Sequence, residues 1–226
     1  MLLRDSIYRA IRQAVLTCEF QPGQELREQV LAERYRVSRS PVRDSLLRLE
    51  QENLVTVLPR QGYRVRPILA SDVEDLFGLH LLIEPACAAA AAIRSDDEAL
   101  RALDRFRGFV LDNEVEFQSF VDYNQSFHRT IANLSGNARL TAVALDLNEQ
   151  FERLVRISLH MFKYEIVREA GLEHGPIIDA LQTRNANLAS RLSHEHSARA
   201  HSRMVTALGL IAQQGGSSAA SPTTMG

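Results

Sequence analysis

The 226-residue sequence predicts a mainly α-helical fold in two parts, a small N-terminal domain that ends in a β-hairpin and a larger C-terminal bundle of helices alone. Apolar residues recur at helical spacing through most of the chain, and two short β-prone runs lie within residues 55–66. The charge divides at the same place. Residues 1–66 hold twelve Arg and eight acidic residues, a net charge of +4, whereas the remainder carries −6. Such a division is typical of a polyanion-binding module joined to a domain with another purpose.

The first two helices follow from apolar stripes. Residues 4–17 place Ile7, Ile11 and Val15 four residues apart, which predicts one amphipathic helix. The segment QPGQ then supplies a turn, and a second stripe runs from Leu26 to Tyr35. Two consecutive amphipathic helices are therefore expected before residue 37.

A third helix and a hairpin complete this domain. Ser40 is the expected N-cap, with Pro41 at the first helical position, and the helix should fade near Asn53. The β-prone runs 55–58 and 63–66 flank Pro-Arg-Gln-Gly and predict a hairpin whose basic tip carries Arg60. Helix, helix-turn-helix and hairpin in this order predict a winged helix-turn-helix over residues 1–66.

After a linker at residues 67–70, the pattern predicts one all-helical domain over residues 71–212. Ser71-x-x-Glu74 and Ser95-x-x-Glu98 have the form of capping boxes and predict two helix starts. Further helical patterns cover about 115–133, 137–162, 164–183 and 186–212. Residues 213–226 are small and polar without an apolar stripe, so we expect them to be disordered.

The composition limits the compartment. No window approaches 18 uninterrupted apolar residues, and charges interrupt the apolar N-terminus, so neither a membrane span nor a secretory signal is expected. Cys18 and Cys87 lie in different regions and form no Cys-x-x-Cys pair. We therefore expect a cytoplasmic protein with reduced thiols and no membrane partner.

The start of the third helix has the residue types that read double-stranded DNA. The second helix of a helix-turn-helix enters the major groove with its N-terminal residues nearest the bases, here Ser38, Arg39, Ser40 and Arg43. An arginine fork matches the O6 and N7 acceptors of guanine, and hydroxyl groups can hold a phosphate. Because a striped helix precedes these residues and a basic hairpin follows them, DNA binding is favoured over the interpretation that Arg39 and Arg43 are only solvated surface charges. Because one helix reads few base pairs, we expect a homodimer on a palindromic operator.

The segment ELREQVLAERYRVSRSPVRDSLLRLEQENLVTVLPRQGYRV resembles the N-terminal domain of the GntR superfamily of bacterial transcription regulators, over nearly all of residues 4–66. The resemblance implies base or phosphate contacts by Arg39 and Arg43, a phosphate contact by Ser40, and approach of Gly62 to the DNA backbone. Two positions depart from the family pattern. Cys18 stands where the family usually has Gly, and Gln29 stands where some relatives carry a DNA-contacting Arg.

All seven histidines lie in the acidic part and indicate a possible metal site. Asn124 and His128 are four residues apart, so they share one helix face, and His174 and His196 can bring imidazoles from two other helices. A nitrogen-rich set of this kind suits Zn(II), with Ni and Mn as alternatives. From spacing alone, the alternative interpretation is that these four residues are unrelated structural or surface residues.

The segments NQSFHRTIANLSGNARL, LEHGPIIDAL and LASRLSHEHS are similar to the helical FCD-type effector domain of FadR-like GntR regulators, over about residues 71–212. This resemblance implies that Asn124, His128, His174 and His196 hold a divalent metal whose open positions take a small carboxylate effector. The effector is thus expected to be a small organic acid.

His80 departs from this second pattern, because many relatives carry an Arg there, four residues before the position of Glu84. Imidazole is a poorer anion partner than guanidinium, so a neutral or hydroxylated effector is an alternative to a carboxylate. Arg129, Arg153 and Arg156 are possible sources of a replacement charge. His80 and Arg156 are the effector-binding candidates.

Three functional interpretations follow. The favoured one is a ligand-responsive repressor. A metal-dependent enzyme is the second, because three histidines around an open metal position also describe catalytic zinc. However, the sequence has no His-Glu-x-x-His, no Ser-His-Asp pattern and no Gly-rich phosphate loop, so we expect no enzymatic activity. The third is a constitutive DNA-binding protein whose helical domain only dimerises.

Overall fold

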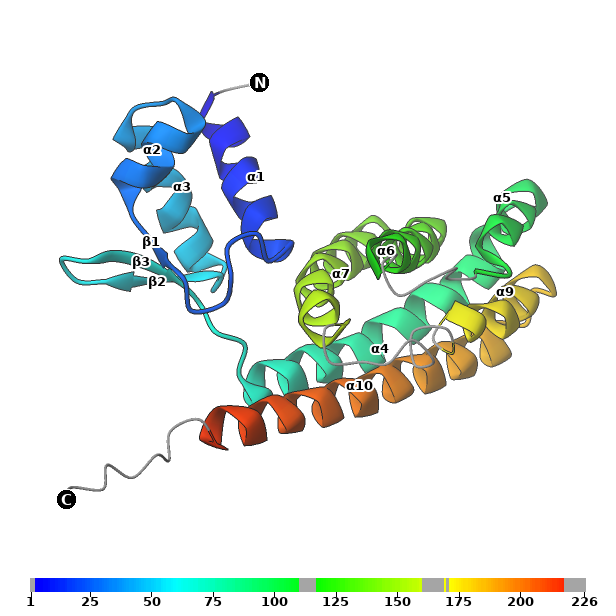
Figure 1. The fold of residues 1–226 in the computed structure, drawn as a ribbon. Helices are drawn as coiled ribbons and strands as arrows, with labels where there is room; N and C mark the ends of the chain where they lie inside the picture. The colour runs from blue at the N-terminus through cyan, green and yellow to red at the C-terminus, as the bar shows by residue number, and fades with distance from the viewer. Residues whose placement is uncertain (1–2, 110–116, 160–168, 170, 218–226) are drawn as a thin grey trace, which may run out of the picture. The chain divides into compact units, whose positions relative to one another are not determined.

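The computed structural model of the chain describes residues 3–109, 117–159, 169 and 171–217, and it divides into two compact units, 1–69 and 70–226 (Figure 1). The described residues are mostly helical, and their strands form a single three-stranded sheet. The predicted fold class is therefore confirmed. The boundary between the units falls within the expected linker.

The N-terminal unit is a three-helix core with a small antiparallel sheet (Figure 1). Its elements are α1 (Leu3–Leu16), β1 (Glu25–Leu26), α2 (Glu28–Tyr35), α3 (Arg39–Gln51), β2 (Val55–Leu58) and β3 (Gly62–Val65). The sheet order is β1-β3-β2, and the hairpin register pairs Val57 with Tyr63. Ile11, Val42, Leu46 and Leu49 are fully buried where α1 packs on α3. The sequence pattern missed β1, because two residues are too few to show alternation.

One helix cap of this unit differs from the sequence prediction, and one turn explains a departure from the family pattern. The N-cap of α3 is Ser38 rather than Ser40, and Pro41 lies in the first turn, where a missing N–H breaks no helical hydrogen bond. Cys18 adopts a φ of 58°, in the left-handed region that a residue with a Cβ disfavours. This backbone conformation gives a physical reason for the Gly that the resembling family usually has there.

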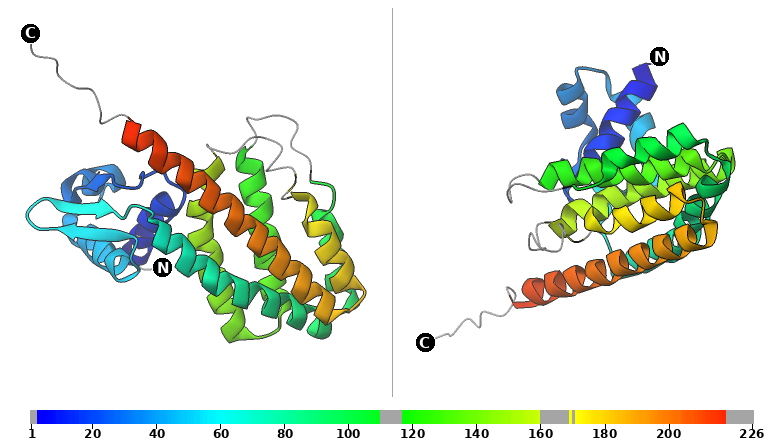
Figure 2. Two further views of the ribbon diagram at one scale, coloured as in Figure 1. Left: turned by 90° about the horizontal axis from the view of Figure 1, so that it is seen from below. Right: turned by 90° about the vertical axis from the view of Figure 1, so that its right-hand side faces the viewer.

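The second unit is a helical bundle organised around α4. Its elements are α4 (Ala70–Arg94), α5 (Asp97–Arg101), the 3-10 helix η1 (Ala102–Phe106), α6 (Phe117–Leu134), α7 (Ala138–Leu159), α9 (His174–Gln182) and α10 (Ala186–Ser217). The long helices α4 and α10 lie side by side, and α4 also packs against α6, α7 and α9 (Figures 1 and 2). Side chains that point inward from these helices therefore meet near the middle of α4.

Several helix ends differ from the expected ones. Ser71 lies inside α4 rather than at its N-cap. The N-cap of α5 is Asp96 rather than the neighbouring Ser95, and the Asp96 carboxylate accepts a hydrogen bond from the backbone N–H of Ala99 at 2.7 Å. Part of the predicted helix 164–183 lies outside the described residues. Residues 213–217, expected to be disordered, continue α10, and residues 218–226 lie outside the described part.

Helix α4 is unusually apolar. Residues Ser71–Arg94 are long and apolar enough to cross a membrane by length and composition, although a central bundle helix meets the same criterion and 44% of the window is buried in the protein. Part of this apolar surface faces outward, because Leu79, Leu82, Ala86 and Ile93 are exposed at spacings of three, four and seven residues. We call these four residues the outer α4 face.

Candidate functional site

The N-terminal residues of α3 are exposed, as a DNA-reading helix requires. Burial of Val42 and Leu46 on one side of α3 leaves Arg39 and Arg43 on the opposite side, and Ser38 at the N-cap is also exposed. The Ser38 side chain makes no capping hydrogen bond. The start of the helix thus presents hydroxyl and guanidinium groups to solvent.

Both arginines contact the first turn of α2. Arg43 donates from Nε and Nη2 to the two carboxylate oxygens of Glu28, at 2.8 and 2.9 Å. This pair raises the pKa of Arg43, chiefly through the hydrogen bond to Glu28. Arg39 donates from Nη2 to Gln29 Oε1 at 2.9 Å. The sequence singled out Gln29 but missed Glu28, because nothing in a linear pattern pairs residues 28 and 43.

The hairpin tip carries the two remaining DNA-binding candidates. Arg60 is exposed in the turn between β2 and β3, with a φ of 67°. Gly62 has a φ of 116°, and a Cβ there would lie 2.7 Å from the backbone oxygen of Leu26. Close packing against β1 therefore already requires Gly62, independently of any approach to DNA.

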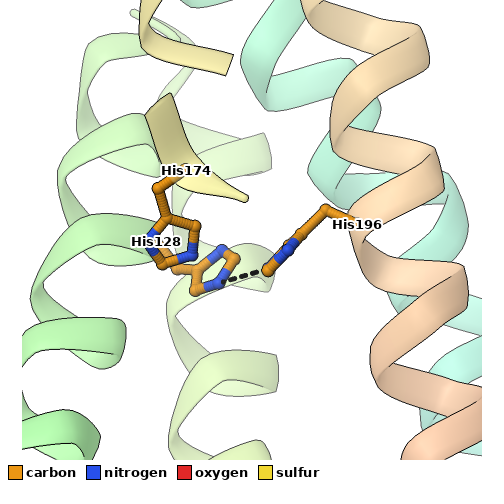
Figure 3. A group of neighbouring side chains, drawn as sticks. All are labelled: His128, His174 and His196. Carbon is orange, nitrogen blue, oxygen red and sulfur yellow. Dashed lines mark hydrogen bonds between the residues drawn. The ribbon is translucent and has the colours of Figure 1, made fainter. Parts of the chain in front are cut away.

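Three of the four predicted metal ligands meet inside the helical unit. His128 on α6, His174 on α9 and His196 on α10 are all buried, and one ring nitrogen of each lies within 4.8 Å of the others (Figure 3). The Nε2 atoms of His128 and His196 are 3.4 Å apart. Two nitrogens bound to one tetrahedral Zn(II) at its usual bond length are separated by about 3.3 Å. The fourth predicted ligand, Asn124, lies one helical turn before His128 and is half-buried.

Carboxylates orient two of these histidines. His128 Nδ1 lies 3.0 Å from Glu84 Oε2, and His196 Nδ1 lies 2.7 Å from Glu173 Oε2. An ionised carboxylate only accepts hydrogen bonds, so each histidine donates from Nδ1 and turns the lone pair of Nε2 toward the centre. Metal-ligating histidines characteristically have such outer partners.

Tyr123 orients the third histidine. Its hydroxyl donates to the backbone oxygen of Phe106 at 2.8 Å, so it accepts from His174 Nδ1 at 2.9 Å. His174 Nε2 is then left buried with no hydrogen-bond partner. When His128 and His196 both donate from Nδ1, the 3.4 Å contact between their Nε2 atoms, drawn as a hydrogen bond in Figure 3, has no proton, and a cation bound among the three rings would stabilise it. The residues present therefore fit the divalent metal implied by the sequence resemblance.

The protonation states agree with this arrangement. Burial lowers the pKa of His174 well below its usual value, and burial likewise lowers the pKa of His196. Burial alone would raise the pKa values of Glu84 and Glu173. The histidine neighbours of Glu84, chiefly His128, lower its pKa to about 2, and His196 together with Arg203 lowers the pKa of Glu173 to about 2. The two glutamates are thus ionised acceptors, and burial favours the neutral form of His174 and His196.

The two effector candidates have different surroundings. His80 is buried on α4, with its ring centroid 6.0 Å from that of His128, and burial lowers its pKa to about 4. The structure brings this residue to the histidine cluster. Arg156 on α7 donates to Glu152 Oε1 from Nε at 2.8 Å and from Nη2 at 2.6 Å. Its charge is therefore already paired.

Sequence reasoning missed Tyr123 and Glu173 as members of this site. Glu173 directly precedes His174, and an acidic residue beside a candidate ligand is a weak signal. Nothing in the sequence marks Tyr123, which reaches His174 across 51 positions. Both residues act on the outer side of the histidines, where spacing rules give no information.

Comparison with known proteins agrees with both units. The model of "Bacterial regulatory proteins, gntR family" matches residues 3–65, and the FCD domain model matches residues 75–199. An uncharacterized HTH-type transcriptional regulator of Streptomyces ambofaciens is 30% identical over 200 residues, covering 85% of this chain and 81% of the relative. The repressor RspR of Escherichia coli is 25% identical, covering 86% and 85%.

Solved structures share the fold. The E. coli protein McbR/YncC superimposes with a TM-score of 0.75 at 17% identity, covering 91% of this chain and 98% of that one. A putative GntR regulator from Rhodococcus sp. RHA1 gives a TM-score of 0.68 at 21% identity, covering 90% and 97%. At these identities the likeness concerns the fold.

A winged helix joined to an FCD domain defines a class of bacterial DNA-binding transcription regulators. This chain belongs to the GntR family and is a transcription regulator with an FCD domain. The curated relatives are named as regulators rather than enzymes, which confirms that the chain is not an enzyme.

Proposed function

We propose that the chain is a cytoplasmic, ligand-responsive repressor that binds a palindromic operator as a homodimer and changes its DNA affinity when a small organic acid binds. Two curated relatives from E. coli, RspR and GlaR, are named as repressors. A recognition helix of this kind reads only a few base pairs, and two symmetric copies double the site. The proposed DNA contacts come from Ser38, Arg39, Ser40, Arg43, Arg60 and Gly62.

The effector site contains one divalent ion held by Asn124, His128, His174 and His196. The observation that carries this proposal is the convergence of one ring nitrogen from each of His128, His174 and His196, whose rings are each held at Nδ1 by another residue. Zn(II) suits this donor set, with Ni and Mn as alternatives. When bound, the ion supplies the positive charge that holds a carboxylate oxygen of the effector.

His80 and Arg156 are the proposed effector contacts beyond the ion. His80 is neutral in its buried setting, so it contributes a hydrogen bond rather than a charge. Arg156 would have to share its guanidinium between Glu152 and the effector. Linkage limits the response, because an effector changes operator affinity only by its differential affinity for the two states, typically about 5- to 150-fold.

The outer α4 face is the proposed dimer interface, with a second copy of the chain as its occupant. Leu82 and Ile93 are 69% and 68% exposed on a helix whose other side is the centre of the bundle. Together with Leu79 and Ala86, these residues are spaced by three, four and seven positions along α4. This is the alternation of three and four residues by which two helices pack together. Two recognition helices on one palindromic operator require a contact between two chains, and this face offers the apolar surface for it.

The direct test of the effector site combines metal analysis with calorimetry. The purified chain should contain a divalent ion, and small carboxylates should bind before but not after removal of the ion by a chelator. Bound carboxylate should then shift affinity for an operator selected from random DNA by 5- to 150-fold. Carboxylate binding that persists without metal would contradict the proposed site. An unchanged operator affinity would favour the constitutive DNA-binding alternative.

The dimer has a separate test. Leu82→Glu places two buried carboxylates at the proposed interface, so sedimentation should show a monomer. Leu172→Glu changes another exposed leucine, 55% exposed, and should leave the dimer intact. A dimeric Leu82→Glu protein would place the interface elsewhere.

A further inference from the structure

A second group of metal-ligating side chains lies next to the three histidines. His80, Glu84 and His128 are all buried, and one ligand atom of each lies within 4.8 Å of the others. His128 belongs to both groups, because its Nε2 faces His196 and its Nδ1 faces Glu84. The proposed function uses one ion, bound at the three histidines, and gives the set His80, Glu84 and His128 no common ligand.

The carboxylate of Glu84 has one satisfied oxygen and one unsatisfied oxygen. Oε2 accepts the hydrogen bond from His128 Nδ1, whereas Oε1 is buried without a hydrogen-bond partner. His80 Nε2 lies 3.7 Å from Oε1, which is too far for a hydrogen bond. Buried polar groups are nearly always satisfied, so an unpaired carboxylate oxygen indicates a missing donor or cation.

His80 does not satisfy Oε1 in its present position. Its ring packs against the aromatic rings of Phe77 and Phe151, and its Nε2 lies 3.7 Å from Oε1, beyond hydrogen-bond distance. Within the described residues, no arginine or lysine pairs with Glu84. A buried carboxylate oxygen therefore faces an imidazole nitrogen, with no cation beside it among the described residues.

The spacing of these two groups suits a metal ion. A nitrogen and an oxygen bound to one tetrahedral ion, at bond lengths of about 2.0–2.2 Å, lie about 3.4 Å apart. The observed 3.7 Å between His80 Nε2 and Glu84 Oε1 exceeds this by a few tenths of an ångström. Both residues lie on α4 one turn apart, so a small side-chain movement closes the difference.

We propose that His80 and Glu84 form a second divalent-cation site, in which His80 Nε2 and Glu84 Oε1 bind the ion while Glu84 Oε2 still accepts the hydrogen bond from His128. The mixed nitrogen and oxygen donors suit a first-row ion such as Zn(II) or Mn(II). The remaining coordination positions take water or an oxygen of the effector. Glu84 then connects the two ions through the His128 ring.

The experiment counts bound ions per chain. The full-length protein, freed of metal with a chelator, is titrated with Zn(II) against a chromogenic competitor, and bound metal is confirmed by native mass spectrometry. The wild-type chain should bind two ions. His80→Ala and the more conservative His80→Asn should each keep one ion. The affinity for the second ion should fall at least tenfold in both variants. His194→Ala removes an exposed histidine of α10 outside both groups and should still bind two ions.

The same titration separates this inference from the proposed function. His174→Ala should lose the ion of the three-histidine site and keep the ion at His80 and Glu84. A single wild-type ion that His174→Ala removes and His80→Ala leaves unchanged would overturn the second site alone. A single ion lost in His80→Ala but kept in His174→Ala would support the second site and contradict the three-histidine site.

Discussion

The two units place their functional side chains in opposite environments. Arg39 and Arg43 of α3 are exposed, and each is held from one side by a residue of α2. His128, His174 and His196 of the bundle are buried, and each is held at Nδ1 by a second residue. Exposed groups keep their usual charge and can exchange partners with a large polyanion. Buried groups have their protonation and direction set by neighbours, which suits selection of a small ion or ligand.

The pH dependence of stability should differ most between the units. His80 is neutral when buried, with its pKa lowered from 6.5 to about 4, but it takes up a proton in the unfolded chain below pH 6.5. The free energy of unfolding should therefore fall as the pH falls from 6.5 to 4, by about 3 kcal/mol for this residue. His174 and His196 shift in the same direction.

Hydrogen exchange of the metal-free protein at pH 7 and pH 5 measures each unit separately. Residues 1–69 contain no histidine, so amides in that unit provide the internal control. Protection should decrease in the helical unit and stay nearly constant in the N-terminal one. An equal decrease in both units would refute the assignment to buried histidines.

Tyr123→Phe tests whether outer partners matter in the buried site. The substitution keeps the ring and removes the acceptor of His174 Nδ1, so the affinity of the three-histidine site should fall by about 10- to 100-fold. Competition with a chelator measures the change. Tyr35→Phe alters a half-buried tyrosine of the other unit and should have no effect. Unchanged affinity in Tyr123→Phe would show that packing alone orients His174.

Arg43→Ala tests the exposed surface. It should cost about 1–3 kcal/mol of binding to the selected operator, and binding of every variant should weaken linearly with the logarithm of salt concentration. Fluorescence anisotropy titrations at several salt concentrations give both quantities. Operator affinity equal to that of the wild type would remove Arg43 from the recognition surface.

Glu28→Gln separates the positioning of Arg43 from its charge. Loss of an acidic residue should raise affinity for random DNA, while loss of the two-oxygen contact with Arg43 should reduce the preference for the selected operator. Glu33→Gln removes the same charge from the same helix without a contact to Arg43 and should keep the preference. Equal specificity ratios in the two variants would show that Glu28 acts by charge alone.

The smallest expected effect concerns the turn after α1. Cys18 has a φ of 58°, so Cys18→Gly should relieve an unfavourable backbone conformation and stabilise the N-terminal unit by about 1 kcal/mol. Cys18→Ala keeps a Cβ and serves as the control in thermal unfolding. A Gly variant no more stable than the Ala variant would show that the turn carries no such strain.

Much of the fold was predictable because it depends on local patterns. Helical periodicity, the QPGQ turn and the two β-prone runs give the order of elements in the N-terminal unit. Helix ends were less predictable. Ser38 and Asp96 are N-caps in place of the expected Ser40 and Ser95, since several polar residues near each helix start have similar capping preferences.

The helical periodicity, the basic recognition helix and the family of the chain follow from the amino-acid sequence alone, because these features depend on residues close together in the chain. The contacts between distant side chains follow from the packing of the helices. The pairings of Glu28 with Arg43, of Tyr123 with His174 and of Glu84 with His128 all join separate elements. Those pairings depend on how helices pack, and burial then fixes the charge and direction of each group in ways that residue spacing does not encode.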